Sequence, residues 1–117
     1  MLDPAVERRL LGLLGLGIRG RLAVLGVDRV REAARNGTVR VAVIAADASR
    51  HSLEKVTRLL AAKQVPTITI ASAAVLGGAA GRETTAVIGV VDAQLAKGIR
   101  ALVDSTDATQ KGSRRKG

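Results

Sequence analysis

The sequence predicts an α/β fold, in which helices cover both faces of a mixed central sheet of about four strands to give a three-layer α-β-α sandwich. Two patterns predict it. Short aliphatic runs alternate along the chain with segments whose apolar residues recur at helical spacing. The 117 residues also suit one domain with one hydrophobic core, which we expect to span residues 1–104.

The first half of the chain is expected to alternate helix and strand. Asp3-Pro4 is typical of a helix start, with an N-cap followed by proline, and this helix is expected to continue to about Leu16. Residues 22–25 predict a short strand. Asp28 is then expected to cap a second helix, and the nearly unbroken aliphatic run at residues 39–45 predicts a strand covered on both faces.

The middle of the chain continues this alternation. A third helix is expected to start at Asp47 or Ser49 and to last to about Lys63, because its apolar residues recur at helical spacing. Pro66 then precedes an expected strand at residues 67–70, a position where the missing N–H of proline is tolerated.

An apolar turn follows that strand. Ser72 is expected to cap a short helix that ends in glycines, and within it Ala74-Val75-Leu76 is followed at once by Gly77. Solvated turns normally carry polar residues and turn formers. These aliphatic side chains are therefore expected to contact a ligand or a partner.

The last part of the chain predicts a strand, a helix and a tail. Residues 85–91 are aliphatic enough for a buried strand, and Asp92 is expected to cap a final helix that ends near Val103. Beyond it the composition turns to Ser, Thr, Gln, Lys, Arg and Gly. We therefore expect a disordered basic tail at residues 105–117.

The charge of the chain favours a polyanionic partner. The formal net charge is +9, and 0% of the residues are aromatic. Lys and Arg bind phosphate with release of counterions, so nucleic acid is the simplest partner, although solubility alone would also explain a basic surface. Without Phe, Tyr or Trp the chain cannot stack bases on aromatic rings, so recognition should rest on shape and phosphate contacts.

Little in the sequence supports catalysis or cofactor binding. It has no Cys, which excludes thiolate metal sites, and its single histidine, His51, has no evident partner. Residues 15–20 match G-x-G-x-x-G, but they follow an expected helix instead of a strand, so we interpret them as the turn that ends that helix. Asp47 and Glu54 lie about two helical turns apart, too far for a shared acid–base role. We expect no enzymatic activity, no cofactor and no metal site.

Three segments carry a family resemblance. They are Gly26-Val27-Asp28-Arg29 at a helix start, the run Val41–Ala45 leading into Asp47, and Val65-Pro66 leading to Ser72 and to residues 76–81. Together, over about residues 10–103, they resemble the kink-turn-binding ribosomal-protein superfamily of the L-seven-Ae and L-thirty-e type, and most closely its small bacterial branch.

The resemblance implies an α-β-α sandwich that binds RNA kink-turns or related internal loops. In that family a helix N-terminus enters the RNA groove at tandem G·A pairs, and an apolar loop contacts a flipped-out base. The resemblance places the start of the second helix at the groove, Asp47 on a neighbouring loop and residues 74–76 against the base. The expected RNA-binding residues are Arg21, Gly26, Asp28, Arg29, Arg31, Asp47, Ala74, Val75, Leu76 and Gly77.

Four positions depart from the pattern of the strong RNA binders in that family, and one of them is Ala46, where those proteins have Glu before the loop Asp. Their pattern is Gly-x-Asn-Glu-x-x-Lys, whereas this chain has Asp28 for Asn, Arg29 for Glu and Glu32 for Lys. An ionised Asp28 only accepts hydrogen bonds, and Glu32 carries the same sign of charge as phosphate. The sequence therefore leaves open which RNA is bound and whether it is a kink-turn.

We expect a monomeric, cytoplasmic, non-enzymatic protein that binds ribosomal or other structured RNA. The alternative is a protein-interaction module of a ribosome or transcription–translation assembly, in which residues 74–76 contact a ribosomal protein or translation factor. A nucleotide-using enzyme is the least favoured interpretation, because no nucleophile–base pair is evident. No apolar run approaches the roughly 20 residues that span a bilayer, so we expect no membrane partner.

Overall fold

The computed structural model describes the backbone of residues 2–116 and the side chains of residues 2–104. Helices and strands alternate along the chain as the sequence predicts. The helices are α1 (Pro4–Arg19), α2 (Val27–Arg35), α3 (Arg50–Ala62), α4 (Ala73–Ala79) and α5 (Ala93–Lys116). The strands are β1 (Ala23–Leu25), β2 (Val41–Ala45), β3 (Thr67–Ile70) and β4 (Val87–Val90).

The strands form one mixed sheet in the order β1-β4-β2-β3. β4 pairs antiparallel with both β1 and β2, whereas β2 and β3 run parallel with Ala45 opposite Ile70. The central strands β2 and β4 are buried along almost their whole length, but β3, at the edge, alternates exposed Thr with buried Ile. This difference in cover explains why β2 and β4 are continuous aliphatic runs in the sequence.

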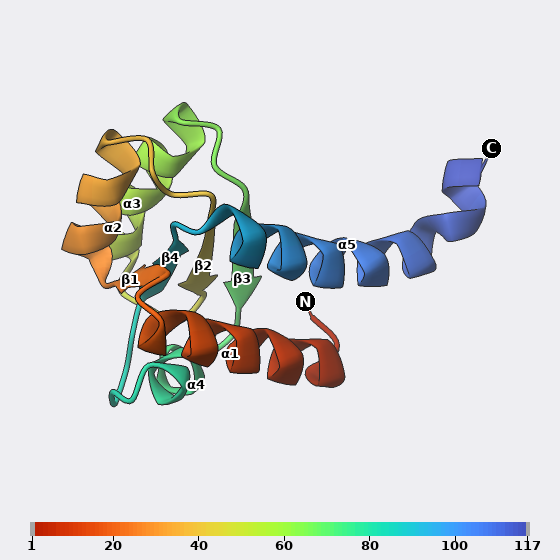
Figure 1. The fold of residues 1–117 in the computed structure, drawn as a ribbon, viewed down its shortest axis with the longest axis horizontal. Coiled ribbons are helices and arrows are strands. Elements are labelled where there is room, and N and C mark those ends of the chain that lie inside the picture. Colours follow the sequence, from red (N-terminus) through yellow and green to blue (C-terminus); the bar gives the residue numbers. More distant parts are fainter. Residues whose placement is uncertain (1, 117) are drawn as a thin grey trace.

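Helices cover both faces of this sheet, so the predicted three-layer sandwich is confirmed (Figure 1). α1, α4 and α5 pack on one face, where Leu10, Leu76 and Ile99 are buried. α2 and α3 pack on the other face through Val30 and Leu60. Within the described residues, no helix is both long enough and apolar enough to cross a bilayer.

Of the three glycines predicted to end α1, only Gly20 does so. α1 continues through Gly15 and Gly17 to Arg19, and Gly20 is its C-cap. Gly17 is buried against Leu95 of α5, whose side chain occupies the space that a Cβ would need. The G-x-G-x-x-G letters therefore serve helix packing and do not form a strand-to-helix turn for a dinucleotide.

Two further helix boundaries differ from the prediction. Gly26, not Asp28, is the N-cap of α2, and Asp28 lies in the first turn. α5 continues past Val103 to Lys116, so the backbone of residues 105–116 is helical where the sequence predicted a disordered tail. That stretch contains good helix formers such as Ala, Gln, Lys and Arg, and no Pro that would stop the helix. Gly117 lies outside the described residues.

Candidate functional site

Several connections meet beyond the carboxyl ends of β2 and β3 and surround an open hollow of about 410 Å³. They are the start of α2, the β2–α3 connection, the start of α4 and the α4–β4 connection. The lining consists of Val27, Asp47, Ala48, Ser49, Ser52, Ala73, Ala74, Thr84 and Ala86. Because these side chains are small or polar, backbone and hydroxyl groups lie close to any molecule that enters the hollow.

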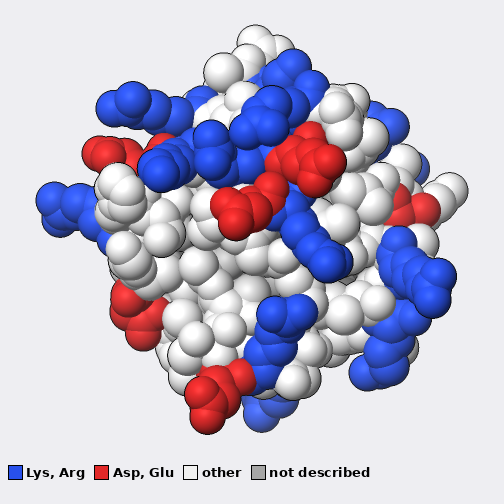
Figure 2. Space-filling model, turned by 90° about the vertical axis from the view of Figure 1, so that its left-hand side faces the viewer, with Lys and Arg blue, Asp and Glu red and all other residues white. Residues whose placement is uncertain are grey.

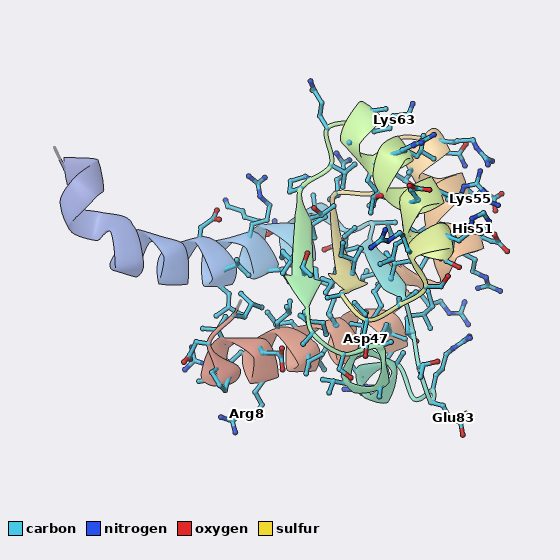
Figure 3. All side chains as sticks on the ribbon, turned by 180° about the vertical axis from the view of Figure 1, so that it is seen from behind. Arg8, Asp47, His51, Lys55, Lys63 and Glu83 are labelled. Carbon is cyan, nitrogen blue, oxygen red and sulfur yellow. The ribbon has the colours of Figure 1, made fainter. Side chains whose placement is uncertain are left out.

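Asp47 links two sides of this hollow. Its carboxylate Oδ1 accepts a hydrogen bond of 2.7 Å from the backbone N–H of Ala73, the first residue of α4. Figure 3 shows Asp47 directly beside α4, below the end of β2. The sequence suggested Asp47 or Ser49 as the cap of α3, but Ser49 caps α3 and Asp47 caps α4. The helix dipole favours a carboxylate in this place.

The start of α4 is fully occupied by the chain's own side chains. Ser72 Oγ accepts hydrogen bonds from the backbone N–H groups of Ala74 at 3.1 Å and Val75 at 3.2 Å, which confirms the predicted cap. Together with Asp47, Ser72 gives an acceptor to each of the first N–H groups of α4. This helix start is therefore closed to an external anion.

The start of α2 is open. Its N-cap, Gly26, has φ +90° and no side chain, and no side chain caps the first turn. The Gly26 N–H donates to the carbonyl of Val87 at 3.0 Å, which ties the helix start to β4. Asp28 and Arg29 are exposed in this first turn. Uncapped N–H groups at a helix start attract anions such as phosphate.

Two different hollows adjoin the first turn of α2. Val27 lines the hollow beside Asp47, whereas Arg29 lines a second hollow that runs along α2 past Glu32 to Asn36. Arg29, predicted as a site residue, is thus separated from Asp47 by the helix itself. A ligand that meets both must straddle the start of α2.

Only some of the RNA-binding residues predicted at positions 74–77 lie at the surface. Ala74 lines the hollow and Val75 is 42% exposed, but Leu76 is fully buried and Gly77 is buried with it. The predicted contact of Leu76 with a ligand is therefore wrong, because Leu76 faces the core between α4 and the sheet. All of these residues lie within helix α4 or at its start and not in a loop.

Gly77 instead allows the α4–β4 connection to fold back over α4. A Cβ placed on Gly77 would lie 2.6 Å from the Cα of Thr84 and 2.9 Å from the carbonyl oxygen of Arg82. The Arg82 N–H donates to the Gly77 carbonyl at 2.8 Å. This close approach brings Thr84 to the hollow, and sequence reasoning missed it. A glycine inside a helix is the signal that indicates such an approach of another backbone segment.

A family model for the ribosomal protein L7Ae/L30e/S12e/Gadd45 family matches residues 17–99. The chain belongs to this family. The resemblance stated from the sequence is thereby confirmed, and the matched residues include the whole hollow and both helix starts described above.

Similar proteins of known sequence or structure support this assignment. The RNA-binding protein YlxQ of Bacillus subtilis (strain 168) is 36% identical over 92 residues, which cover 79% of this chain and 92% of that protein. A solved protein of unknown function from Bacillus halodurans C is 34% identical, with a TM-score of 0.74 over 81% of this chain and 96% of that one. The Giardia lamblia 15.5kD RNA binding protein shares the fold at 23% identity, with a TM-score of 0.75 over 92% of each chain.

Two other arginines that the L7Ae-type resemblance suggested do not line the hollow. Arg21 is exposed in the α1–β1 connection, where its φ is +63°. Arg31 is partly buried along α2, and its Nε atom is buried without a hydrogen-bond partner. The structure therefore does not bring Arg21 and Arg31 to the hollow that Asp47 lines, although both lie within five positions of Gly26 along the chain.

The remaining candidate residues for catalysis stay apart. Figure 3 shows His51 and Lys55 on α3 with their side chains away from Asp47. His51 is exposed, and no group of His, Asp or Glu able to hold a metal ion occurs among the described residues. The candidate site is thus a surface of small polar groups, an open helix start and exposed cations.

The face that carries α2 and α3 is rich in exposed Lys and Arg. Figure 2 shows blue side chains across its upper part, with fewer red ones between them. Within residues 2–104 none of these basic side chains forms an ion pair. Unpaired surface cations create a positive potential that attracts polyanions.

Proposed function

We propose that this chain is a non-enzymatic RNA-binding protein that places the start of α2 in a groove of structured RNA. The observation that carries this proposal is the uncapped first turn of α2, where Val27 lines one hollow and Arg29 lines another. Membership of the L7Ae-type family and the name of the Bacillus subtilis relative support it.

Phosphate binding follows from the chemistry of this helix start. The free N–H groups of the first turn attract a phosphate oxygen, and Arg29 adds a guanidinium on one flank. The small lining of the hollow on the other flank leaves room for the edge of a base beside Ser49 and Thr84. Their hydroxyl groups donate and accept hydrogen bonds.

Aliphatic side chains at the rim of the hollow can pack against an unstacked base. Ala74 and the exposed Val75 lie at the rim of the hollow, where aliphatic contact replaces the aromatic stacking that this chain cannot provide. RNA kink-turns and related internal loops combine a widened groove with such a displaced base. We therefore propose a kink-turn-like or ribosomal RNA as the ligand of a monomeric, cytoplasmic protein.

Two acidic residues set the expected strength of binding. Asp28 lies in the open first turn, and Glu32 shares the flank of Arg29. Both carry the same sign of charge as phosphate, so they weaken the attraction that the helix start and Arg29 provide. We propose that the chain prefers structured RNA but binds a kink-turn less tightly than relatives with Asn and Lys at these positions.

Titration of the purified chain with three RNAs across a salt series tests this function. A kink-turn RNA should bind most tightly, a plain duplex more weakly, and a single strand most weakly, with affinity falling as salt rises. Equal affinity for all three RNAs would contradict the structured-RNA preference. Absence of salt-dependent binding, with a protein partner retained after nuclease treatment, would replace RNA binding by a protein-interaction role.

A further inference from the structure

A second concave surface lies at the opposite end of the sheet from the α2 start. This basic groove, about 630 Å³ in volume, lies between the segment before β2, the α3–β3 connection and the first turns of α5. Figure 3 shows Lys63, on its rim, at the end of the domain opposite Asp47. The groove shares no lining residue with the hollow at the α2 start.

The charges of this groove are almost all positive. Arg40, Lys63, Lys97 and Arg100 line it, and Asp104 is the acidic residue in the lining. All of these basic side chains are exposed, and none of them forms an ion pair within residues 2–104. Charges in water are screened beyond about 8 Å, so a ligand feels all of them only when it lies in the groove itself.

The geometry distributes these cations over several elements. Lys97 and Arg100 are three positions apart on α5 and so lie on the same side of that helix. Arg40 precedes β2 and Lys63 ends α3, so the groove is bounded by cations from separate segments. Aliphatic residues such as Val65 and Pro66 also line the groove.

We propose that this basic groove binds the phosphate backbone of a second RNA segment, which makes the protein a bridge between two RNA helices. The inference rests on the proposed RNA-binding function and extends it. A row of phosphates matches several cations spread along an open groove, whereas a single small anion would contact only one or two of them. The groove has no aromatic side chain for stacking, so it contacts the backbone and not the bases.

The test uses a plain RNA duplex of about 16 base pairs, without an internal loop, as the probe of the groove. The double variant Lys97→Glu with Arg100→Glu reverses two charges at exposed helical positions. Arg8→Glu with Arg9→Glu on α1 makes the same change in net charge away from both sites, as the position of Arg8 in Figure 3 shows. Far-UV circular dichroism checks that both variants keep the helical content of the parent chain.

We expect the groove variant to bind the duplex roughly tenfold more weakly than the α1 control, with the salt slope of log K reduced by about one for each lost phosphate contact. A native gel should show a ternary complex of protein, kink-turn RNA and duplex for the parent chain and the control. That complex should be lost in the groove variant, while its binding of kink-turn RNA stays within about twofold of the control.

The outcomes separate this inference from the proposed function. If the groove variant and the α1 control bound the duplex with equal affinity, the proposal that the groove binds RNA would be overturned, even if kink-turn RNA still bound. Loss of kink-turn binding in Arg29→Glu, with duplex binding kept, would support two independent sites. Competition by poly-glutamate as effective as competition by duplex RNA would assign the groove to an acidic protein and overturn the proposal.

Discussion

The starts of α2 and α4 lie on two sides of the same hollow but differ in how their N–H groups are satisfied. α4 begins with Ser72 and Asp47, whose oxygen atoms accept hydrogen bonds from its first N–H groups. α2 begins with Gly26, which has no side chain, and no other side chain replaces it. One helix start has side-chain acceptors within the fold, and the other has none.

This difference teaches how a small domain without aromatic residues can form a binding surface. A free helix start costs stability, because capping side chains typically contribute about 1 kcal/mol. The start of α2 lacks this contribution. It is held in position instead by the hydrogen bond from the Gly26 N–H to the Val87 carbonyl of β4. Under the proposed function, the first N–H groups of α2 are already oriented before RNA binds, which lowers the entropic cost of binding.

The largest expected effect comes from closing the space around Gly77. Gly77→Ala should lower the free energy of unfolding by about 2–3 kcal/mol, because the new Cβ would meet the backbone of Thr84, which cannot move as a flexible side chain would. Urea denaturation followed by circular dichroism measures this change. The matched control is Gly78→Ala.

The Gly78 control shows whether the effect is steric or a property of glycine in a helix. Gly78 is exposed in α4, and a Cβ there meets nothing within 4 Å. Gly78→Ala should therefore be neutral or stabilise by up to about 1 kcal/mol, since alanine is the better helix former. Similar losses in both variants would show that the approach of the α4–β4 connection is not what requires Gly77.

Removing both caps of α4 should make that helix start resemble the start of α2. The double variant Asp47→Ala with Ser72→Ala is expected to lose about 1.5–2 kcal/mol of stability, because each cap contributes about 1 kcal/mol. Hydrogen exchange at the Ala73 and Val75 N–H groups should accelerate. Asp47→Asn keeps a hydrogen-bond acceptor and should lose less than Asp47→Ala, and an equal loss would contradict the capping role of the carboxylate oxygen.

The fold was predictable because its signals are local. Asp3, Ser72 and Asp92 cap helices where the sequence indicates, and the buried strands β2 and β4 appear as aliphatic runs. The misplaced end of α1 has a tertiary cause. α1 continues through Gly17, which packs against Leu95 of α5, and that packing partner is more than 70 residues away along the chain.

The candidate site was only partly predictable, for the same reason. Gly26 and Asp47 could be placed from the sequence, but the burial of Leu76 depends on how α4 lies on the sheet, which the local pattern does not reveal. Thr84 was missed because it reaches the hollow through the fold-back over Gly77. Aliphatic residues next to a turn fit a core and a contact surface equally well, and only the packing decides between them.

Charge reversal at the open helix start should weaken RNA binding without unfolding the protein. Arg29→Glu is expected to lower affinity for kink-turn RNA about tenfold at moderate salt, because one phosphate contact is lost and a repulsive charge is added. Fluorescence anisotropy measures the affinity. Arg58→Glu, an exposed reversal on α3, is the control for net charge. If the two variants lose affinity equally, a general positive field and not the α2 start binds the RNA.

The smallest expected effect tests the difference between the two helix starts most directly, because the substitution is expected to strengthen RNA binding at the start of α2. Asp28→Asn removes a negative charge from the first turn of α2 and adds an amide donor, so affinity for kink-turn RNA should rise about three- to fivefold. Stability should fall slightly, by about 0.3–1 kcal/mol, since the helix dipole favours Asp at this place.

Glu7→Gln, on α1, removes the same charge far from the site and should raise affinity much less. If Asp28→Asn raises the affinity for RNA and lowers the free energy of unfolding, the first turn of α2 binds an anion. The Asp28 carboxylate would then partly take the place of that anion in the free protein. If Asp28→Asn left both quantities unchanged, the free N–H groups of α2 would not be the contact for RNA, and Ser49 and Thr84 across the hollow would become the next residues to change.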